Sequence, residues 1–388
     1  MKELIATTLF GLENVLAAEL ESLGAESVQI QNRAVSFAGD TAMMYRANYH
    51  LRTALRILKP LHSFPAKNED EIYGKIKEME WEKYMDIHDL FAVDTVLLSK
   101  QYKHSGFVSQ RVKDGIVDRF RDRTGRRPSV DLKNPGLRVN IHLTDTHCSV
   151  SLDSSGSSLH KRGYRTQPYK APLNEVLAAG MILLSDWQPD QAFLNPMCGS
   201  GTLCIEAGMI ARGLPGGHYR NGFGFQNWKT YDPVLFESIR RERYLVEHDE
   251  FNIIACDIDF PAIRSAQQNL AGSGMLGKIR LQKADFKTWS TEFKEGVIIM
   301  NPPYGERLED ANLNDLYKSI GDTLKLKYTG FQAWVLSGNP GALKHIGLRP
   351  GKKLSLFNGP IQCKYHFYDL YEGSRKIVNK TKGQERKF

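Results

Sequence analysis

Hydrophobic and polar positions divide the chain into two stretches with different patterns. Up to residue 158, short alternating segments are mixed with amphipathic segments, whereas after Pro172 short apolar runs alternate regularly with segments of helical period. The first pattern predicts α+β structure, and the second predicts a doubly wound parallel sheet. The expected fold class is therefore α/β, with a Rossmann-like domain that follows an α+β region.

The first stretch is expected to form two α+β regions, residues 1–60 and residues 61–158. The first region contains predicted strands at Leu4–Thr8 and around Val28 and Val35, and predicted helices at Leu12–Leu23 and Thr41–Asn48. The second contains predicted helices at Glu69–Met79 and Gln110–Arg127, and predicted strands at Thr95–Ser99, Leu137–Leu143 and Cys148–Leu152. A Ser/Gly-rich break at 154–158 then leads into a basic linker, residues 159–171.

The second stretch, residues 172–373, is expected to form the Rossmann-like domain. Its predicted strands are Ala192–Leu194, Ile253–Cys256, Ile279–Leu281, Val297–Met300 and Phe331–Leu336, with helices near 202–211, 260–271 and 313–326. A hairpin around Asn358-Gly359 predicts an antiparallel edge. Residues 213–250 form a Gly- and aromatic-rich insertion that we expect to act as a lid, and residues 374–388 form a basic tail.

Composition excludes several classes of protein. The chain has 388 residues, of which 41% are hydrophobic and 25% charged, and no apolar run approaches the ~20 residues of a membrane span. Five cysteines occur without a C-x-x-C pair or a close histidine partner, so we expect reduced thiols and no metal site. The amino-terminal pattern is unlike a secretory signal, which favours a cytoplasmic protein.

The basic charge of the chain is concentrated in its middle. The net charge is +8, and residues 100–170 alone contain 15 basic and 6 acidic residues. Basic side chains interleaved with tyrosines are typical of surfaces that bind phosphates and unstacked bases. Candidate RNA-binding residues are Lys103, Arg111, Lys113, Arg162 and Arg165. The alternative is a solvated helix face, because the segment after Gln110 has helical spacing.

A glycine-containing loop, residues 195–202, directly follows the first predicted parallel strand and opens a helix. Gly199 and Gly201 permit a sharp turn and a close approach to a ligand. The loop lacks the G-K-[ST] of a P-loop, and Cys204 stands where a dinucleotide fingerprint has its third small residue. By itself the pattern is equally consistent with a tight turn.

Acidic residues follow the next two predicted strands. Asp257 ends its strand and is the candidate acceptor for ribose hydroxyls, while Asp259 is better explained as a helix N-cap. Asp285 suits the edge of an adenine, although a loop cap explains it equally well.

The most specific pattern is Asn301-Pro302-Pro303-Tyr304, which follows the strand Val297–Met300. An exocyclic amine of a base is a poor nucleophile, because its lone pair is delocalised into the ring. The Asn301 side-chain oxygen and the Pro302 carbonyl can accept its two N–H bonds and aim the lone pair at an electrophilic methyl group. Pro302 and Pro303 stiffen the loop, and Tyr304 offers a stacking face for a flipped-out base. A simple proline turn is the alternative.

With these motifs the chain resembles S-adenosylmethionine-dependent RNA methyltransferases that carry an N-terminal THUMP domain, in particular bacterial enzymes that methylate guanine N2 in large-subunit rRNA. The resemblance extends over the ferredoxin-like start, the THUMP-like segment 113–118, the linker 159–165, residues 172–174, and the C-G-S-G-T and N-P-P-Y-G-E-R strings. It implies that Cys198, Gly199, Gly201 and Thr202 hold the methionine part of the cofactor, Asp257 its ribose and Asp285 its adenine. Asn301 to Tyr304 hold the base, and Asn301 also borders the cofactor. Relatives often carry Asp where this chain has Asn195, whose amide is expected to accept a bond from the cofactor's ammonium group.

These observations predict an RNA methyltransferase that uses S-adenosylmethionine and modifies a guanine at N2, with large-subunit rRNA favoured over tRNA. Methylation of tRNA guanine, of adenine N6 or of DNA involves the same site chemistry, because each presents an amine to the same acceptors. A non-catalytic RNA-binding assembly factor is a second hypothesis, and a nucleotide-dependent oxidoreductase is a third. The pattern contains no prediction of oligomeric state.

Overall fold

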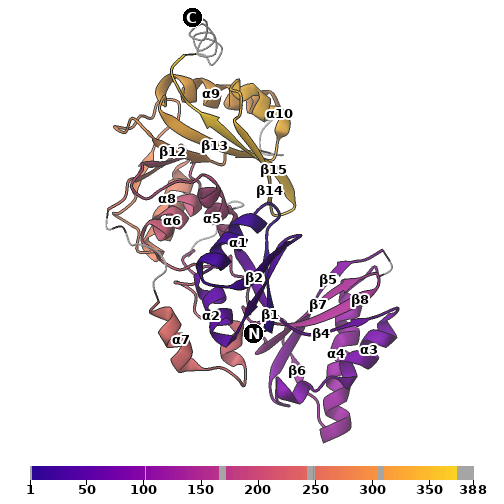
Figure 1. The fold of residues 1–388 in the computed structure, drawn as a ribbon. Coiled ribbons are helices and arrows are strands. Elements are labelled where there is room, and N and C mark those ends of the chain that lie inside the picture. Colours follow the sequence, from indigo (N-terminus) through magenta and orange to yellow (C-terminus); the bar gives the residue numbers. More distant parts are fainter. Residues whose placement is uncertain are drawn as a thin grey trace, which may run out of the picture. The chain divides into compact units, whose positions relative to one another are not determined.

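A computed structural model describes residues 2–100, 102–165, 172–242, 248, 250–304 and 310–373 (Figure 1). The chain divides into two compact units. Unit 1 contains residues 1–163 and 215–245, and unit 2 contains residues 164–214 and 246–388. Three predicted segments lie outside the described residues: the tail 374–388, residues 166–171 of the basic linker, and Gly305 to Arg307 of the longer N-P-P-Y string.

Unit 1 is built on one eight-stranded mixed sheet. Its strands in spatial order are β2 (Glu26–Gln31), β3 (Ala34–Gly39), β1 (Lys2–Thr8), β4 (Ala54–Pro65), β8 (His147–Asp153), β7 (Leu137–Thr144), β5 (Leu90–Leu98) and β6 (Ser129–Val130). Its helices are α1 (Glu13–Ser22), α2 (Thr41–His50), α3 (Glu69–Glu78), α4 (Ser105–Thr124) and α7 (Pro233–Arg240), with 3-10 turns at Trp81–Lys83 and Gly224–Asn227. Asp40 and Asn68 cap α2 and α3 by accepting backbone N–H bonds of 2.8 Å.

Strand β4 joins the two predicted α+β regions across residue 60. It runs from Ala54 to Pro65 and pairs with β1 on one side and with β8 on the other, so the two predicted α+β regions share one continuous sheet. Proline is rare in central strands because it has no backbone N–H to donate, so the presence of Pro60 argued against a strand at this position in the sequence. The structure accommodates it at a bulge, where the register with β8 shifts between Pro60 and His62.

The insertion between the two halves of the second stretch belongs to unit 1. Phe225 is fully buried and stacks on Tyr45 of α2 with a centroid distance of 4.2 Å, and Phe236 of α7 meets Phe225 edge-on at 5.0 Å. Arg46 adds a two-pronged ion pair with Glu242, with N–O distances of 2.8 and 2.7 Å. Phe223, Phe225 and Trp228, three of the aromatic side chains that suggested a lid, therefore belong to the core of unit 1, and residues 215–245 pack with this unit although they lie within the second stretch of the sequence.

Unit 2 is a doubly wound sheet, as predicted. Its strands in spatial order are β11 (Arg280–Lys283), β10 (Ile253–Asp257), β9 (Phe193–Pro196), β12 (Gly296–Met300), β13 (Phe331–Ser337), β15 (Ile361–Asp369) and β14 (Lys352–Asn358). The first five are parallel, and β15 and β14 form the expected antiparallel edge hairpin.

Helices cover both faces of this sheet. In Figure 1, α5 (Glu175–Leu184), α6 (Thr202–Ala211) and α8 (Phe260–Gly272) lie on one side, and α9 (Asp310–Lys327) and α10 (Pro340–Leu343) lie on the other, followed by a 3-10 turn at Lys344–Ile346. Tyr317, Ile320 and Leu324 of α9 are fully buried and pack in one cluster with the strands. The strand order reverses beside β9, between β10 and β12, and ligands of such sheets bind at this point beyond the carboxyl ends of the strands.

Candidate active site

The glycine-containing loop is fixed to the neighbouring strand by backbone hydrogen bonds. Cys198 N donates to Cys256 O at 3.0 Å, and Gly199 N donates to the Asp257 carboxylate at 2.9 Å. Gly199 and Gly201 have φ values of +56° and +79°, which disfavour other residues. A Cβ at Gly201 would lie 3.3 Å from Ala266 Cβ, whereas one at Gly199 would meet no atom within 4 Å. The loop therefore leaves open space beside Gly199.

The acidic residues of the next two loops are held by local backbone groups. Asp257 accepts from Gly199 N and from Asp259 N, at 2.9 Å each, and so joins the two loops. Asp259 occupies the N-cap position of α8 without a side-chain capping bond. Asp285 accepts from Lys287 N at 2.9 Å, which is the loop-capping role weighed as its alternative.

Asn195 has a structural role, contrary to the expectation that its amide faces the cofactor. The residue is fully buried, its Nδ2 donates to Ile299 O at 2.7 Å, and its Oδ1 accepts from the Cys204 thiol at 3.2 Å. The amide thus links β9 to β12 and to α6, and its polar atoms are already partnered.

Asn301, which follows β12, differs from Asn195 in the hydrogen bonding of its side-chain oxygen. Its Oδ1 is buried and has no hydrogen-bond partner among the described residues. Leaving a buried acceptor unpaired costs about 1–3 kcal/mol, and native structures rarely tolerate this without reason. Asn301 therefore offers an acceptor for an N–H donor that the described part of the chain does not supply.

Tyr304 is held in place by the edge hairpin. Asn358 Nδ2 donates to the Tyr304 hydroxyl at 2.8 Å, and the Cys363 thiol contacts the same oxygen at 3.8 Å. Burial raises the pKa of Tyr304 well above its usual range, so the phenol stays neutral. The ring packs against Gly338, where an added Cβ would lie 2.7 Å from Tyr304 Cδ2. Pro302 is buried and Pro303 half-buried, which completes a rigid loop.

The residues that hold Tyr304 were not predicted from the sequence. Gly338, Asn358 and Cys363 come from β13 and the hairpin, and only the pairing of β13, β15 and β14 brings them to Tyr304. Asn269 of α8 was likewise missed, although its Nδ2 donates to Ser200 O at 3.1 Å and supports the glycine-containing loop.

Two predicted RNA-binding arginines are internal to the fold. Arg162 is 2% exposed and donates to the carbonyls of Leu159 and Arg52. Arg165 is bound to Glu175 and to the hydroxyls of Ser200 and Thr202 within unit 2. The two arginines lie next to a glycine and a tyrosine in the sequence, a pattern that predicted phosphate contact. In the structure, both guanidinium groups donate to acceptors of the protein instead.

The other three candidates lie on or just before α4. Lys103 is exposed, and Lys113 is half-buried with an ion pair to Asp114 at 2.6 Å. Arg111 pairs with Asp70 and lies over the ring of Tyr73, 4.6 Å from its centroid. Lys103 and Lys113 therefore remain candidates for phosphate contact, whereas Arg111 is already engaged on both sides.

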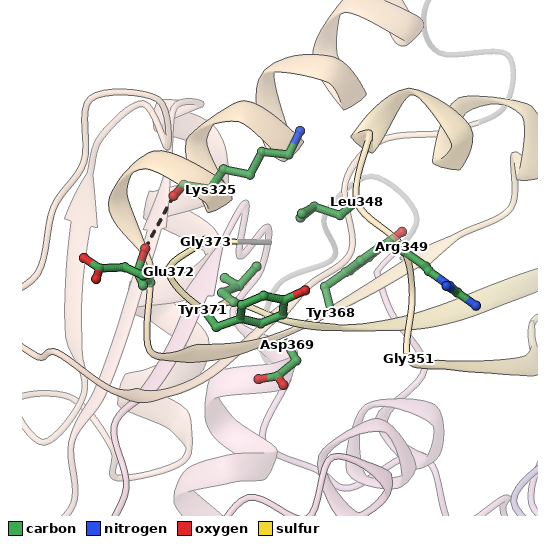
Figure 2. A pocket seen from close by; sticks show the side chains of 11 residues that line it. Lys325, Leu348, Arg349, Gly351, Tyr368, Asp369, Tyr371, Glu372 and Gly373 are labelled. Atoms are coloured by element: carbon green, nitrogen blue, oxygen red, sulfur yellow. Dashed lines mark hydrogen bonds between the residues drawn. The ribbon is translucent and has the colours of Figure 1, made fainter. Parts of the chain in front are cut away.

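A pocket of about 610 Å³ lies far from these loops (Figure 2). Its lining includes Lys325, Arg349, Asp369 and Glu372, around the end of β15. Asp369 pairs with Gln332 at the start of β13, so this pocket is at the amino-terminal edge of the parallel strands. The candidate active site lies at the opposite, carboxyl-terminal edge.

The family is decided by comparison with known domains. The model of the RMKL-like methyltransferase domain matches residues 162–366, which is more than half of the chain. The chain belongs to this methyltransferase family. The RlmL ferredoxin-like domain matches residues 3–58 and the THUMP domain matches residues 66–153, which confirms the resemblance stated from the motifs. Among the described residues, no helix has the length and apolarity needed to cross a membrane.

Individual relatives of this RMKL-like methyltransferase are similar over most of its length. A Synechocystis protein, named among the RNA methyltransferases, is 38% identical, with 94% of this chain and 96% of the relative covered. A ribosomal RNA large subunit methyltransferase K/L of Syntrophotalea carbinolica is 37% identical over 95% of this chain, which spans about half (53%) of that relative. The solved structure of SMU.472, described as a methyltransferase complexed with S-adenosylhomocysteine (SAH), matches with a TM-score of 0.86 and 30% identity, covering 96% of this chain and 99% of that one.

Proposed function

We propose that the chain transfers a methyl group from S-adenosylmethionine to the exocyclic N2 amine of a guanine in large-subunit rRNA, in the cytoplasm. The observation that carries the chemistry is the buried Oδ1 of Asn301 after β12, which accepts no hydrogen bond from any residue that the structure describes. The family membership and the names of the K/L relatives support the choice of reaction and of RNA.

The residues present fit the cofactor. The hydroxyl of Thr202 at the start of α6, the open space beside Gly199 and the carboxylate of Asp257 would hold its methionine part, its sulfur region and its ribose, respectively. Asp285 is assigned to the adenine, and Cys198, which is 8% exposed, lines the loop. When bound, S-adenosylmethionine supplies an electrophilic methyl group on a positively charged sulfur.

The N-P-P-Y loop prepares the nucleophile. Asn301 Oδ1 and the Pro302 carbonyl accept the two amine hydrogens, which localises the lone pair on nitrogen and directs it to the methyl carbon. Tyr304, fixed by Asn358, stacks against the flipped-out guanine. The new N–C bond forms as the C–S bond breaks and its electron pair passes to sulfur, and the methylated nitrogen then releases one proton to solvent.

The variant Asn301→Ala tests this assignment. Because the acceptor acts on the reacting amine, we expect kcat to fall by about 10²–10³-fold or more, while calorimetry shows an unchanged affinity for SAH. Asn301→Asp, which keeps an acceptor oxygen, should retain more activity than Asn301→Ala.

The control is Asn252→Ala, which removes an exposed amide before β10 and should leave both quantities unchanged. Loss of SAH binding in Asn301→Ala, or full activity in that variant, would contradict the role given to Asn301.

A further inference from the structure

The guanidinium group of Arg165 makes several hydrogen bonds inside unit 2, which RNA contact does not explain. Its Nη1 donates to Ser200 Oγ at 3.0 Å, and its Nη2 donates to Thr202 Oγ1 at 3.1 Å. Nε and Nη2 both donate to Glu175 Oε1, at 3.0 and 2.9 Å. One guanidinium group therefore connects the first turn of α5 to both hydroxyls of the glycine-containing loop.

The surroundings make this arrangement rigid. Glu175 is 6% exposed, and Asn174 fixes the start of its helix by accepting from Val176 N at 2.9 Å and Leu177 N at 3.2 Å. Ser200 and Thr202 are 4% and 3% exposed. The planar guanidinium presents its donors in a fixed fork, and hydrogen bonds to charged groups are stronger than neutral ones.

The contacts with Arg165 also determine the direction in which the hydroxyl hydrogens of Ser200 and Thr202 point. Ser200 Oγ and Thr202 Oγ1 both accept from Arg165, so their own hydrogens are turned away from it. The two oxygens also lie 3.5 Å apart, where either can donate to the other, so at least one hydroxyl hydrogen remains available for donation. Thr202 opens α6, which begins without a side-chain cap, so a positive guanidinium lies next to the positive end of a helix. Glu175 already neutralises this guanidinium, so the uncapped start of α6 supplies the field that favours a carboxylate, and Arg165 contributes by fixing the two hydroxyls.

We propose that Arg165 is a positioning residue for the amino-acid end of the cofactor, acting through Ser200 and Thr202. The inference rests on the proposed role of the glycine-containing loop. The nucleoside end lies with Asp257 and Asp285, whose own contacts are to backbone N–H groups of the loops after β9, β10 and β11 and include none to Arg165.

The test compares two ligands that differ in the amino-acid part. SAH has it, whereas 5′-methylthioadenosine has the adenine, ribose and sulfur without it. In Arg165→Gln we expect the affinity for SAH, measured by calorimetry, to fall by about tenfold or more, and the affinity for 5′-methylthioadenosine to change less than about twofold. Arg165→Lys, which keeps the charge but not the fork, should restore part of the SAH affinity.

Lys161→Gln is the matched control, because it removes an exposed positive charge from the same linker and should leave both affinities unchanged. Glu175→Gln frees the guanidinium from its ion pair and should weaken SAH binding in the same direction, which keeps the test open if Arg165→Gln does not fold. The salt dependence of RNA binding should be the same in Arg165→Gln and in the wild type.

Equal losses for the two ligands would show a general structural role, and no loss of SAH affinity would show no role; either result overturns the inference. A wild-type chain that binds 5′-methylthioadenosine as tightly as SAH would overturn the role of the glycine-containing loop, and with it this inference.

Discussion

Two asparagines at the ends of adjacent strands illustrate how burial alone does not define a site. Asn195 lies within β9 and Asn301 directly follows β12, and both carry a buried side-chain oxygen. The oxygen of Asn195 accepts from Cys204, whereas that of Asn301 has no partner among the described residues. The available acceptor, rather than the residue type, distinguishes the reactive position from the structural one.

Gly338→Ala tests the orientation of Tyr304 at the same scale. The new Cβ would lie 2.7 Å from Tyr304 Cδ2, so the ring must move from the position that Asn358 defines. Since stacking on an aromatic ring is worth ~1–3 kcal/mol per base, kcat/KM for RNA should fall by about tenfold or more, with SAH affinity unchanged. Steady-state kinetics measure this effect.

Gly74→Ala serves as its control, because a Cβ at this helical glycine meets nothing within 4 Å. Unaltered kinetics in Gly338→Ala would mean that the ring position does not affect the reaction.

At the residue scale, the sequence was informative wherever a short segment brings the chemistry together. Asn301 to Tyr304 and Gly199 to Thr202 are contiguous, so their loops could be predicted from the strands before them. Asn358 was recognised only as a turn residue, because its bond to Tyr304 depends on how the hairpin packs beside β13. The occupied guanidinium groups of Arg162 and Arg165 likewise depend on acceptors far away in the chain.

At the element scale, periodicity predicted most helices and strands of both units, but it missed β4 in unit 1 and α5 in unit 2. Parallel strands buried on both faces give clear apolar runs, whereas β4 contains Pro60 and a bulge that interrupt its pattern. The aromatic insertion was predicted to be a distinct segment, but the part of the chain against which it packs could not be predicted. Nothing local to residues 213–250 indicates that Phe225 packs on Tyr45, about 180 residues earlier.

Phe225→Ala tests the assignment of this insertion to unit 1. The side chain is fully buried between Tyr45, Phe223 and Phe236, and its truncation should cost about 3–5 kcal/mol of the free energy of unfolding. Hydrogen exchange should show lost protection in β1, β4 and α2, with the strands of unit 2 unaffected. Lost protection confined to β9 and β12 would contradict the assignment.

At the scale of the whole molecule, the chain combines a THUMP-containing unit with a methyltransferase unit. The concentration of charge at 100–170 indicated RNA binding, but the structure reduces the number of available side chains. Lys103 and Lys113 remain accessible to phosphate, whereas Arg162 and Arg165 stabilise the fold. Composition predicts that a basic surface exists, but only the fold determines which charges form it.

The double variant Lys103→Glu/Lys113→Glu tests this surface. If both side chains contact phosphates, RNA affinity should fall and the slope of log K against log salt should become shallower by about two. Lys278→Glu, which reverses an exposed charge before β11, should leave the slope unchanged. An unchanged slope in the double variant would show that these lysines belong to a solvated face.

The most direct test of the central claim is a transfer assay with the purified chain and radiolabelled S-adenosylmethionine. Undermodified large-subunit rRNA and tRNA, taken from a strain that lacks the gene, are offered separately, and the nucleosides are analysed afterwards. We expect label in N2-methylguanosine from large-subunit rRNA, and none with Asn301→Ala. Label in tRNA or in another methylated base would contradict the proposed substrate, and no transfer to either RNA by a chain that binds SAH would contradict the proposed activity.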